Sequence, residues 1–265
     1  MKEFSGRVAV ITGGASGIGL AMARRFASAG MRIVLADIEE PALEAAVDDL
    51  RSAGTEVLGV PTDVADLEAV VNLRDTTLEA FGSVHVLCNN AGVVGHSIVH
   101  SPIDVWRWVV GVNLFGVING CNVFLPGLVE QGEGHVVNTA SLAGLRGNAV
   151  LGVYCTTKFA VVGLSESLAE ELHASGSKVG VSVVCPGFVQ TRIGESARNM
   201  PAHLKADQPA RDMINPAVMA GIPAKDVADA VFEAVVADRL YVLNHKDMAR
   251  AALDQRLSLL FDQGP

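Results

Sequence analysis

The residues Thr12-Gly13-Gly14-Ala15-Ser16-Gly17-Ile18-Gly19 follow a short apolar run and open directly into an amphipathic stretch. Glycines at such a point let the backbone turn tightly and approach a pyrophosphate closely. Amide N–H groups and the positive end of the following helix would then hold the phosphate charge. A plain strand-to-helix turn is the alternative explanation for the glycines taken alone. The stretch therefore predicts a strand, a candidate nucleotide loop and a helix.

The same alternation of short apolar runs and longer amphipathic stretches continues along the chain, which is typical of βαβ units around a buried parallel sheet. The expected strands are Arg7 to Thr12, Arg32 to Ala36, Glu56 to Val60, His85 to Asn89, His135 to Ala140, Lys178 to Cys185 and Leu240 to Leu243. The expected helices are Gly17 to Ala29, Pro41 to Ala53, Asp66 to Phe81, Ile103 to Leu128, Val153 to Ala174 and Lys225 to Ala237. Since no linker or repeat interrupts them, we expect one domain over residues 1–265.

The residues from about 188 to 223 depart from this alternation, with prolines at 201, 209, 216 and 223 among scattered apolar residues. Such a composition is typical of a long active-site loop or a small lid. We expect this segment to close over a substrate.

Composition narrows the classes of partner. Half of the 265 residues are apolar and 18% are charged, which excludes intrinsic disorder. The net charge is −9, and no basic run offers a footprint for nucleic acid. The apolar run at Val8 to Ile11 is too short for a signal peptide, and the four cysteines have no CxxC or metal-ligand spacing. We therefore expect a cytoplasmic protein without a nucleic-acid partner.

The stretch Trp108 to Val129 holds 22 residues without a charge, close to the length of a membrane span. Asn113, Asn119, Asn122 and Pro126 interrupt it, and these groups are costly in hydrocarbon. We expect a helix buried in protein and no membrane partner.

The second expected strand is followed by Asp37, 18 residues after Gly19. A dinucleotide fold places at this point the acid that accepts the adenosine ribose hydroxyls. A solvated carboxylate at a strand end is the duller alternative. Asp37 would repel a 2′-phosphate, and no Arg or Lys follows it directly or lies within Gly13 to Gly19. The expected cofactor is therefore NAD rather than NADP.

The glycines follow the pattern TGxxxGxG, and further motifs come after them in order. These are Asn89-Asn90-Ala91-Gly92, Val112-Asn113-Leu114-Phe115-Gly116, Ser141, Tyr154-Cys155-Thr156-Thr157-Lys158, Pro186-Gly187 and Thr191. On these motifs the chain resembles the short-chain dehydrogenase/reductase family from about Lys2 to Thr191. The resemblance implies an α/β, Rossmann-type, doubly wound fold of about seven parallel strands with helices on both faces.

The resemblance implies four catalytic residues: Asn113, Ser141, Tyr154 and Lys158. Tyr154 and Lys158 are four positions apart, so both side chains leave the same face of a helix. The ammonium is expected to favour the phenolate and lower the phenol pKa. Tyr154 would exchange a proton with the substrate oxygen, Ser141 would bind that oxygen, and Asn113 would position a water. Each of three residues taken singly also has an ordinary structural explanation. Ser141 could cap a helix, the Tyr154 ring could pack with its hydroxyl at the surface, and the Lys158 amine could reach into solvent.

The expected cofactor contacts lie at the carboxyl ends of the strands. They are Gly13, Ser16, Gly17, Ile18, Gly19, Asp37, Ile38, Asp63, Val64, Asn90, Ala91, Gly92, Tyr154, Lys158, Pro186, Gly187 and Thr191. No metal site is expected, because His96 and His100 have metal-ligand spacing but no evident third ligand. His96 follows the Asn-Asn-Ala-Gly motif and could reach the substrate pocket.

The motifs together predict an NAD-dependent oxidoreductase that transfers a hydride between nicotinamide and a secondary alcohol or ketone. Apolar side chains occur in the 188–223 segment and beside Ser141 and Tyr154. If they face the cleft, they favour an apolar or cyclic substrate. Contacts in the core or between subunits would explain these apolar side chains equally well. In the segment they are Phe188, Ile193, Met200, Leu204, Met213, Ile214, Val218, Met219 and Ile222, and beside the catalytic residues they are Leu142, Leu145, Val150 and Leu151. An NADPH-dependent 3-oxoacyl thioester reductase and a non-catalytic nucleotide-binding protein stay as alternatives. The resemblance also implies a homo-oligomer, a dimer or a homotetramer, in which the helix from about Ile103 pairs across subunits.

Overall fold

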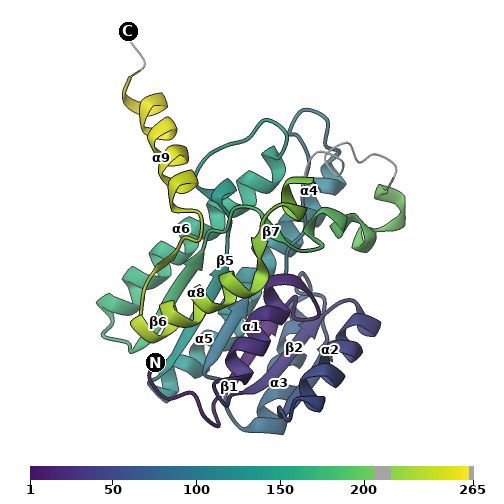
Figure 1. Cartoon of the computed structure of the whole chain (residues 1–265), viewed down its shortest axis with the longest axis vertical. Helices are drawn as coiled ribbons and strands as arrows, with labels where there is room; N and C mark the ends of the chain where they lie inside the picture. Colours follow the sequence, from purple (N-terminus) through teal and green to yellow (C-terminus); the bar gives the residue numbers. More distant parts are fainter. Residues whose placement is uncertain (206–215, 263–265) are drawn as a thin grey trace.

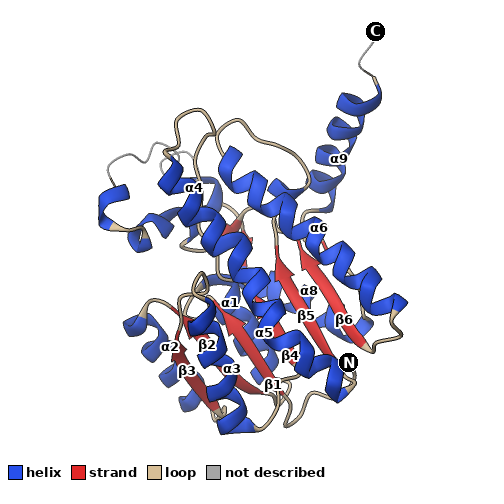
Figure 2. Cartoon of the chain, turned by 180° about the vertical axis from the view of Figure 1, so that it is seen from behind, coloured by secondary structure: helices blue, strands red, loops and turns tan. Residues whose placement is uncertain are grey.

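A computed structural model describes residues 1–205 and 216–262 of the chain. Its main sheet has seven parallel strands in the order β3-β2-β1-β4-β5-β6-β9 (Figures 1 and 2). The strands are β1 Val8–Thr12, β2 Arg32–Asp37, β3 Val57–Pro61, β4 Val86–Asn89, β5 Gly134–Thr139, β6 Val179–Val184 and β9 Tyr241–Val242. All seven expected strands are present, and each of their ends lies within one residue of the expected position. The predicted α/β sheet is therefore confirmed.

Helices cover both faces of the sheet, as predicted for a doubly wound fold. One face carries α1 Gly17–Ala27, α2 Glu40–Ser52 and α8 Ala224–Ala237, and the other carries α3 Leu67–Phe81, α5 Gly116–Gln131 and α6 Gly152–Ala174. The strands are near-continuous runs of apolar residues because each is covered on both sides.

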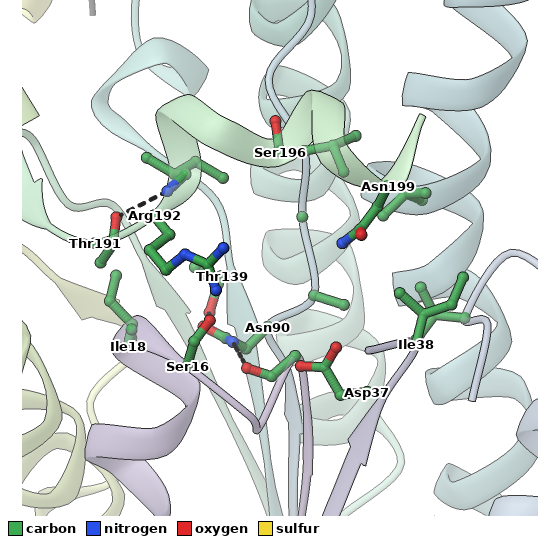
Figure 3. Close-up of a pocket in the computed structure, with 18 of the residues that line it drawn as sticks. Ser16, Ile18, Asp37, Ile38, Asn90, Thr139, Thr191, Arg192, Ser196 and Asn199 are labelled. Carbon is green, nitrogen blue, oxygen red and sulfur yellow. Dashed lines mark hydrogen bonds between the residues drawn. The ribbon is translucent and has the colours of Figure 1, made fainter. Parts of the chain in front are cut away.

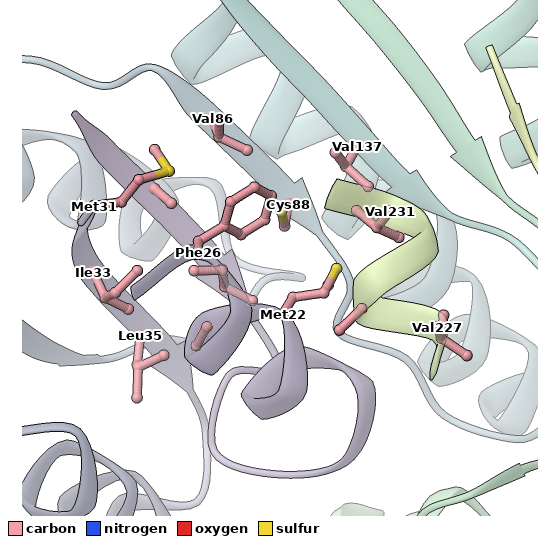
Figure 4. Packing of buried hydrophobic residues seen from close by; sticks show 14 of the residues in the cluster. Met22, Phe26, Met31, Ile33, Leu35, Val86, Cys88, Val137, Val227 and Val231 are labelled. Atoms are coloured by element: carbon pink, nitrogen blue, oxygen red, sulfur yellow. The ribbon is translucent and has the colours of Figure 1, made fainter. Parts of the chain in front are cut away.

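The core on the α1 side is built where α1 crosses the centre of the sheet. Met22 and Phe26 of α1 pack together with Ile33 and Leu35 of β2 and with Val231 of α8 (Figure 4). Phe26 is 1% exposed. Truncating such a ring to alanine costs about 3–5 kcal/mol of folding free energy. This packing fixes the N-terminus of α1 beside the end of β1.

The chain reverses its direction across the sheet between β1 and β4. From β1 it proceeds outward through β2 to β3, and it then returns to pair β4 with the other side of β1. The loops that follow β1 and β4 leave in opposite directions at the carboxyl edge of the sheet. Ligands of open α/β sheets bind in the crevice that forms at such a switch point.

The predicted helix from Ile103 to Leu128 is interrupted. The chain is helical from α4 Ile103–Val110 to the end of α5, but Gly111–Phe115 forms a π-helical turn that carries Asn113. Hydropathy periodicity does not distinguish a π turn from an α turn, so this feature was not predicted. Such turns occur frequently at functional sites.

Within the described residues, the span Ile103–Gln131 is the one helix long and apolar enough to cross a membrane. A core helix of a soluble protein passes the same test. Here α5 packs against α3 and the sheet, and Asn119 is buried with its amide donating to the Val64 carbonyl at 2.9 Å. This packing agrees with a helix buried in protein.

The 188–223 segment is more structured than the predicted loop. Its described parts contain β7 Val189–Gln190, two 3₁₀ segments at Ile193–Asn199 and Ala202–Leu204, and β8 Ile222–Pro223. β7 and β8 pair in parallel and bring the two ends of the segment together. Of the apolar side chains expected to face the cleft, Met200 and Val218 are buried and Met219 is exposed. Pro209, Met213 and Ile214 lie outside the described residues.

A C-terminal helix, α9 Lys246–Phe261, was not predicted. Its hydrophobic pattern is weak because acidic and basic residues are spread around it, and of its side chains Ala249 alone is buried. The helix extends away from the sheet (Figures 1 and 2). Its first turn nevertheless lies beside the Pro186-Gly187 motif, since the Gly187 N–H donates to Nδ1 of His245, the residue before the helix, at 3.2 Å.

Candidate active site

The loop after β1 needs glycine at two points for steric reasons. Gly17 has φ +55°, and a Cβ there would lie 3.1 Å from the Thr191 side chain. A Cβ on Gly19 would overlap the carbonyl oxygen of Gly13. The loop is therefore folded too tightly for side chains. It leaves the N-terminus of α1 open toward the cleft, as a phosphate site requires.

Asp37 ends β2 at the edge of the same cleft, where the predicted ribose acceptor should lie. Its carboxylate accepts hydrogen bonds from the amides of Ala15 and Glu39, both at 3.1 Å. Burial raises the pKa of Asp37 from its ordinary value, and the two amide hydrogen bonds oppose that shift. The side chain is thus held in place by the glycine loop and by the residues after β2.

The Asn-Asn-Ala-Gly motif is tied to the glycine loop by Thr12, which the sequence analysis did not single out. The Thr12 hydroxyl accepts from the amides of Asn90 and Ala91 at 2.9 and 3.1 Å. The Asn90 side chain donates back to the Thr12 carbonyl at 3.0 Å and accepts from Thr139 at 3.3 Å. These bonds join the ends of β1, β4 and β5 at the floor of the cleft, where Figure 3 shows Asn90 beside Thr139.

A buried amide network supports this floor. Asn89 donates to Asn138 of β5 at 2.9 Å, and Asn138 donates to Ser165 of α6 at 3.1 Å. Asn138 and Ser165 were not predicted, because a polar residue in an apolar strand or helix gives no sign of its partner. The network links the sheet to α6, the helix that carries the catalytic motif.

Tyr154 and Lys158 lie on the first turns of α6, as predicted. The Lys158 Nζ donates to the Thr139 carbonyl at 2.8 Å and lies 5.5 Å from the centre of the Tyr154 ring. Lys158 as a whole is 3% exposed. The lysine is therefore fixed between the end of β5 and the tyrosine.

Ser141 and Asn113 are placed differently from each other. The Ser141 hydroxyl accepts from the Ala143 amide at 3.1 Å and lies beside Tyr154, where it lines the cleft. Asn113 is fully buried, and its amide pairs with both backbone groups of Val93 at 2.8 and 2.9 Å and donates to Thr157 at 3.2 Å. Its side chain holds the strand-end loop and is not among the cleft-lining residues.

The pKa of Tyr154 corrects one expectation. Burial raises it to about 12, although the hydrogen bond with Ser141 opposes this shift. Burial also lowers the pKa of Lys158 to about 8. Burial thus shifts both groups toward their neutral forms, opposite to the expected lowering of the phenol pKa. In this state the phenol is protonated and suited to donate.

The cleft has a volume of about 450 Å³ and runs from Asp37 to Tyr154. With the exceptions of Gly19 and Asn113, all of the predicted site residues line it. Ile193 and Val218, two of the apolar residues considered as facing the cleft, line it as well. Further lining residues were not predicted, and they are Glu39, Thr62, Ala65, Val93, Arg107, Trp108, Gly111, Val112, Thr139, Ala140, Val189, Arg192, Ser196, Arg198, Asn199 and Pro201. Several of these come from the 188–223 segment, which was expected to close over a substrate, but no local pattern indicated which of its polar side chains would line the cleft.

The family model for the short chain dehydrogenases matches residues 7–202, about three quarters of the chain. The chain belongs to the short-chain dehydrogenase/reductase family. It is an oxidoreductase that acts on CH–OH groups and uses a nicotinamide cofactor.

Relatives match this dehydrogenase over most of their length. The C alpha-dehydrogenase of a Sphingobium species is 33% identical over 270 aligned residues, covering 99% of this chain and 88% of the relative. The 1-deoxy-11-beta-hydroxypentalenate dehydrogenase of Streptomyces exfoliatus is 35% identical, covering 94% and 86%. A solved short-chain dehydrogenase/reductase from Burkholderia phymatum in complex with NAD superposes with a TM-score of 0.96 at 44% identity, covering 100% of this chain and 98% of that one.

The dehydrogenase's own residues fit a dinucleotide. The glycine loop offers a cradle that side chains would fill, the N-terminus of α1 faces the cleft, and Asp37 stands at one end with Tyr154 at the other. Among residues 1–205 and 216–262, no three His, Cys, Asp or Glu side chains are grouped so that they could hold a metal ion. His96, which was expected to be able to reach the substrate pocket, is not among the described residues that line the cleft or the adjoining cavity.

Proposed function

We propose that this dehydrogenase uses NAD and interconverts an apolar, cyclic secondary alcohol with its ketone, with Tyr154 as the acid/base. The observation that carries the proposal is that Ser141 and Tyr154 line two cavities at once. One is the cofactor cleft, and the other has a volume of about 390 Å³. A substrate in the second cavity would meet the proton-transfer residues at the junction.

The lining of the second cavity supports an apolar substrate. Its walls are mostly aliphatic or aromatic and come from the segment after β5, both ends of the 188–223 segment and α9. They include Leu142, Leu151, Phe188, Ile193, Val218, Met248, Ala251 and Ala252, with Arg146, Asn148 and Gln255 as polar members. Apolar walls with few polar groups are typical of pockets for hydrophobic small molecules. The name of the Streptomyces exfoliatus relative also specifies a hydroxylated substrate.

The preference for NAD is supported by Asp37. Its carboxylate lies at the adenosine end of the cleft, where a 2′-phosphate would meet like charge. The Burkholderia phymatum relative was solved in complex with NAD.

Each catalytic group has a distinct task in this proposal. The bound nicotinamide supplies the carbon that exchanges a hydride with the substrate. Tyr154 passes a proton to or from the substrate oxygen, and the Ser141 hydroxyl hydrogen-bonds that oxygen. Lys158 keeps a positive charge beside the phenol from its fixed position on the Thr139 carbonyl. Asn113 holds the loop at Val93, which lines the cleft, so it acts as a positioning residue.

A panel of alcohols with NAD tests the substrate class. We expect cyclic apolar secondary alcohols to be oxidised with a kcat/KM at least about tenfold above that for polyols of similar size, because one methylene in an apolar pocket is worth about tenfold or more. Polyols turned over more efficiently than the cyclic alcohols would contradict the proposal.

We also propose that the dehydrogenase forms a dimer or a homotetramer through α4 and α5. Exposed apolar side chains on these helices support this, among them Ile103, Phe115 and Val129. Light scattering tests it, and a monomer at micromolar concentration would contradict it.

A further inference from the structure

Two arginines of the 188–223 segment lie in the cofactor cleft, although neither is near Asp37 in the sequence. Arg192 and Arg198 come from the segment that begins after β7, and both line the cleft together with Asp37 and Glu39. Figure 3 shows Arg192 and Asn199 across the cleft from Asp37 and Ile38. Neither the glycine loop nor the residues directly after Asp37 include an Arg or a Lys, so these two are brought to the cleft by the fold. Two free guanidinium groups at this place would be expected to attract the 2′-phosphate of NADP.

The contacts of Glu39 show that these guanidinium groups are not free. Its carboxylate accepts from Nε of Arg198 and from the Asn199 amide, both at 2.8 Å. The guanidinium of Arg192 lies 4.0 Å from the same carboxylate and pairs more closely with Glu195, at 3.1 Å. The Arg198 hydrogen bond is the main cause that lowers the pKa of Glu39, so the carboxylate stays ionised. Each arginine is thus already matched by a carboxylate.

Glu39 is itself fixed at the corner where the adenosine ribose would bind. Its amide donates to the Asp37 carboxylate at 3.1 Å, so the two acids lie on adjoining parts of one turn. The Glu39 and Arg198 side chains are about a quarter exposed, at 22% and 27%, which leaves their ion pair partly shielded from water. A shielded pair with good geometry is stronger than a solvated surface pair.

We propose that Glu39 is a second determinant of cofactor choice, which acts by holding Arg198 in an ion pair and so denying it to the 2′-phosphate of NADP. A nearby arginine is what accommodates this phosphate in NADP-binding sites of the fold. Asp37 repels the phosphate, and Glu39 occupies the cation that would otherwise attract it. The inference rests on the NAD preference proposed above.

The test is a titration of the purified protein with NADH and with NADPH, followed by calorimetry or nicotinamide fluorescence. In Glu39→Gln, which keeps a hydrogen-bonding side chain, we expect the NADPH dissociation constant to fall about tenfold, since one charge-assisted bond to phosphate becomes available. The NADH constant should change by less than about threefold. An unchanged ratio of the two constants in Glu39→Gln would overturn the inference.

Arg198→Met separates two explanations for such a gain. If Glu39 acts through Arg198, the gain in NADPH affinity disappears in the double variant Glu39→Gln/Arg198→Met. If the gain persists in the double variant, Glu39 acts by its own charge and the role of Arg198 is refuted. Arg198→Met alone should leave NADPH affinity unchanged within about twofold, because the guanidinium is already paired; a clear loss would also contradict the proposal. This single variant tests the inference even if Glu39→Gln unfolds.

Asp49→Asn is the matched control. Asp49 lies on α2 and forms an exposed ion pair with Arg24 of α1 at 2.8 Å. Neither Asp49 nor Arg24 is among the described residues that line the cleft. The substitution should change neither constant. A wild-type protein that prefers NADPH would refute the proposed NAD preference, whereas NADH preference with an inert Glu39→Gln would refute this inference alone.

Discussion

The Nζ atom of Lys158 lies 5.5 Å from the centre of the Tyr154 ring, one turn along the same helix. The amine cannot move freely, because it is buried and donates to the Thr139 carbonyl. The phenol has its proton in this state, since burial raises its pKa to about 12. The structure therefore holds the amine and the phenol in a fixed relation at one point of the cleft, as the proposed proton transfer requires.

Tyr154→Phe tests the proton-transfer role. Because the acid/base is lost while the ring stays, we expect turnover to fall by about 10²-fold to 10⁴-fold. The NADH dissociation constant should stay within about threefold of wild type. In the wild type, alcohol oxidation should accelerate as the pH rises, because the phenol must lose its proton to act as a base. Near-normal turnover in the variant would refute this mechanism.

Lys158→Met tests whether the buried amine costs stability. Its pKa is lowered by burial to about 8 from an ordinary 10.5, so the unfolded chain binds more protons between these values. The charged amine therefore lowers the free energy of unfolding in full below about pH 8, and this destabilisation disappears toward pH 10.5. At pH 7 we expect the variant's free energy of unfolding to exceed that of wild type by about 1–3 kcal/mol, with turnover lost.

Urea denaturation of both proteins near pH 7 and near pH 10 measures the difference. The gain of the variant should shrink at the higher pH. A variant that is less stable than wild type at pH 7 would mean that the hydrogen bond to Thr139 outweighs the burial of the charge.

Gly19→Ala tests the closed packing of the nucleotide loop. The new methyl group would overlap the Gly13 carbonyl oxygen, so we expect the loop to shift. NADH binding should then weaken at least about tenfold, and the free energy of unfolding should fall by about 1–3 kcal/mol. Gly163→Ala on the exposed side of α6 is the control, since its Cβ meets nothing within 4 Å and should stabilise the helix by about 0.5–1 kcal/mol. Equal behaviour of the two variants would contradict this account of the loop.

Ala252→Phe tests the contribution of α9 to the substrate cavity. Ala252 lines this cavity and not the cofactor cleft, so a larger side chain should raise the KM for an apolar alcohol at least about tenfold and leave NADH binding unchanged. Ser258→Phe, at an exposed position of α9 that is outside the described cavity lining, should change neither value. An unaffected KM in Ala252→Phe would place the substrate elsewhere.

The features that could be predicted from the sequence are those set by residues close together in the chain. The sheet followed from near-continuous apolar runs such as β1, and the cofactor cleft followed from the glycine spacing and the Tyr154–Lys158 interval. The contacts of the cleft with Glu39 and Arg198 could not be predicted, because 159 positions separate these residues and each alone is an ordinary surface charge. The helix α9 was missed since its pattern is barely amphipathic. The direction of the Tyr154 pKa shift was missed because desolvation depends on packing that spacing does not encode.

Parallel titration of the wild-type protein with NADH and NADPH tests the central claim most directly. If Asp37 binds the adenosine ribose, NADH should bind at least about tenfold more tightly than NADPH, because the 2′-phosphate meets like charge in a site whose arginines are already paired. Equal affinities, or tighter binding of NADPH, would contradict this account of the cleft.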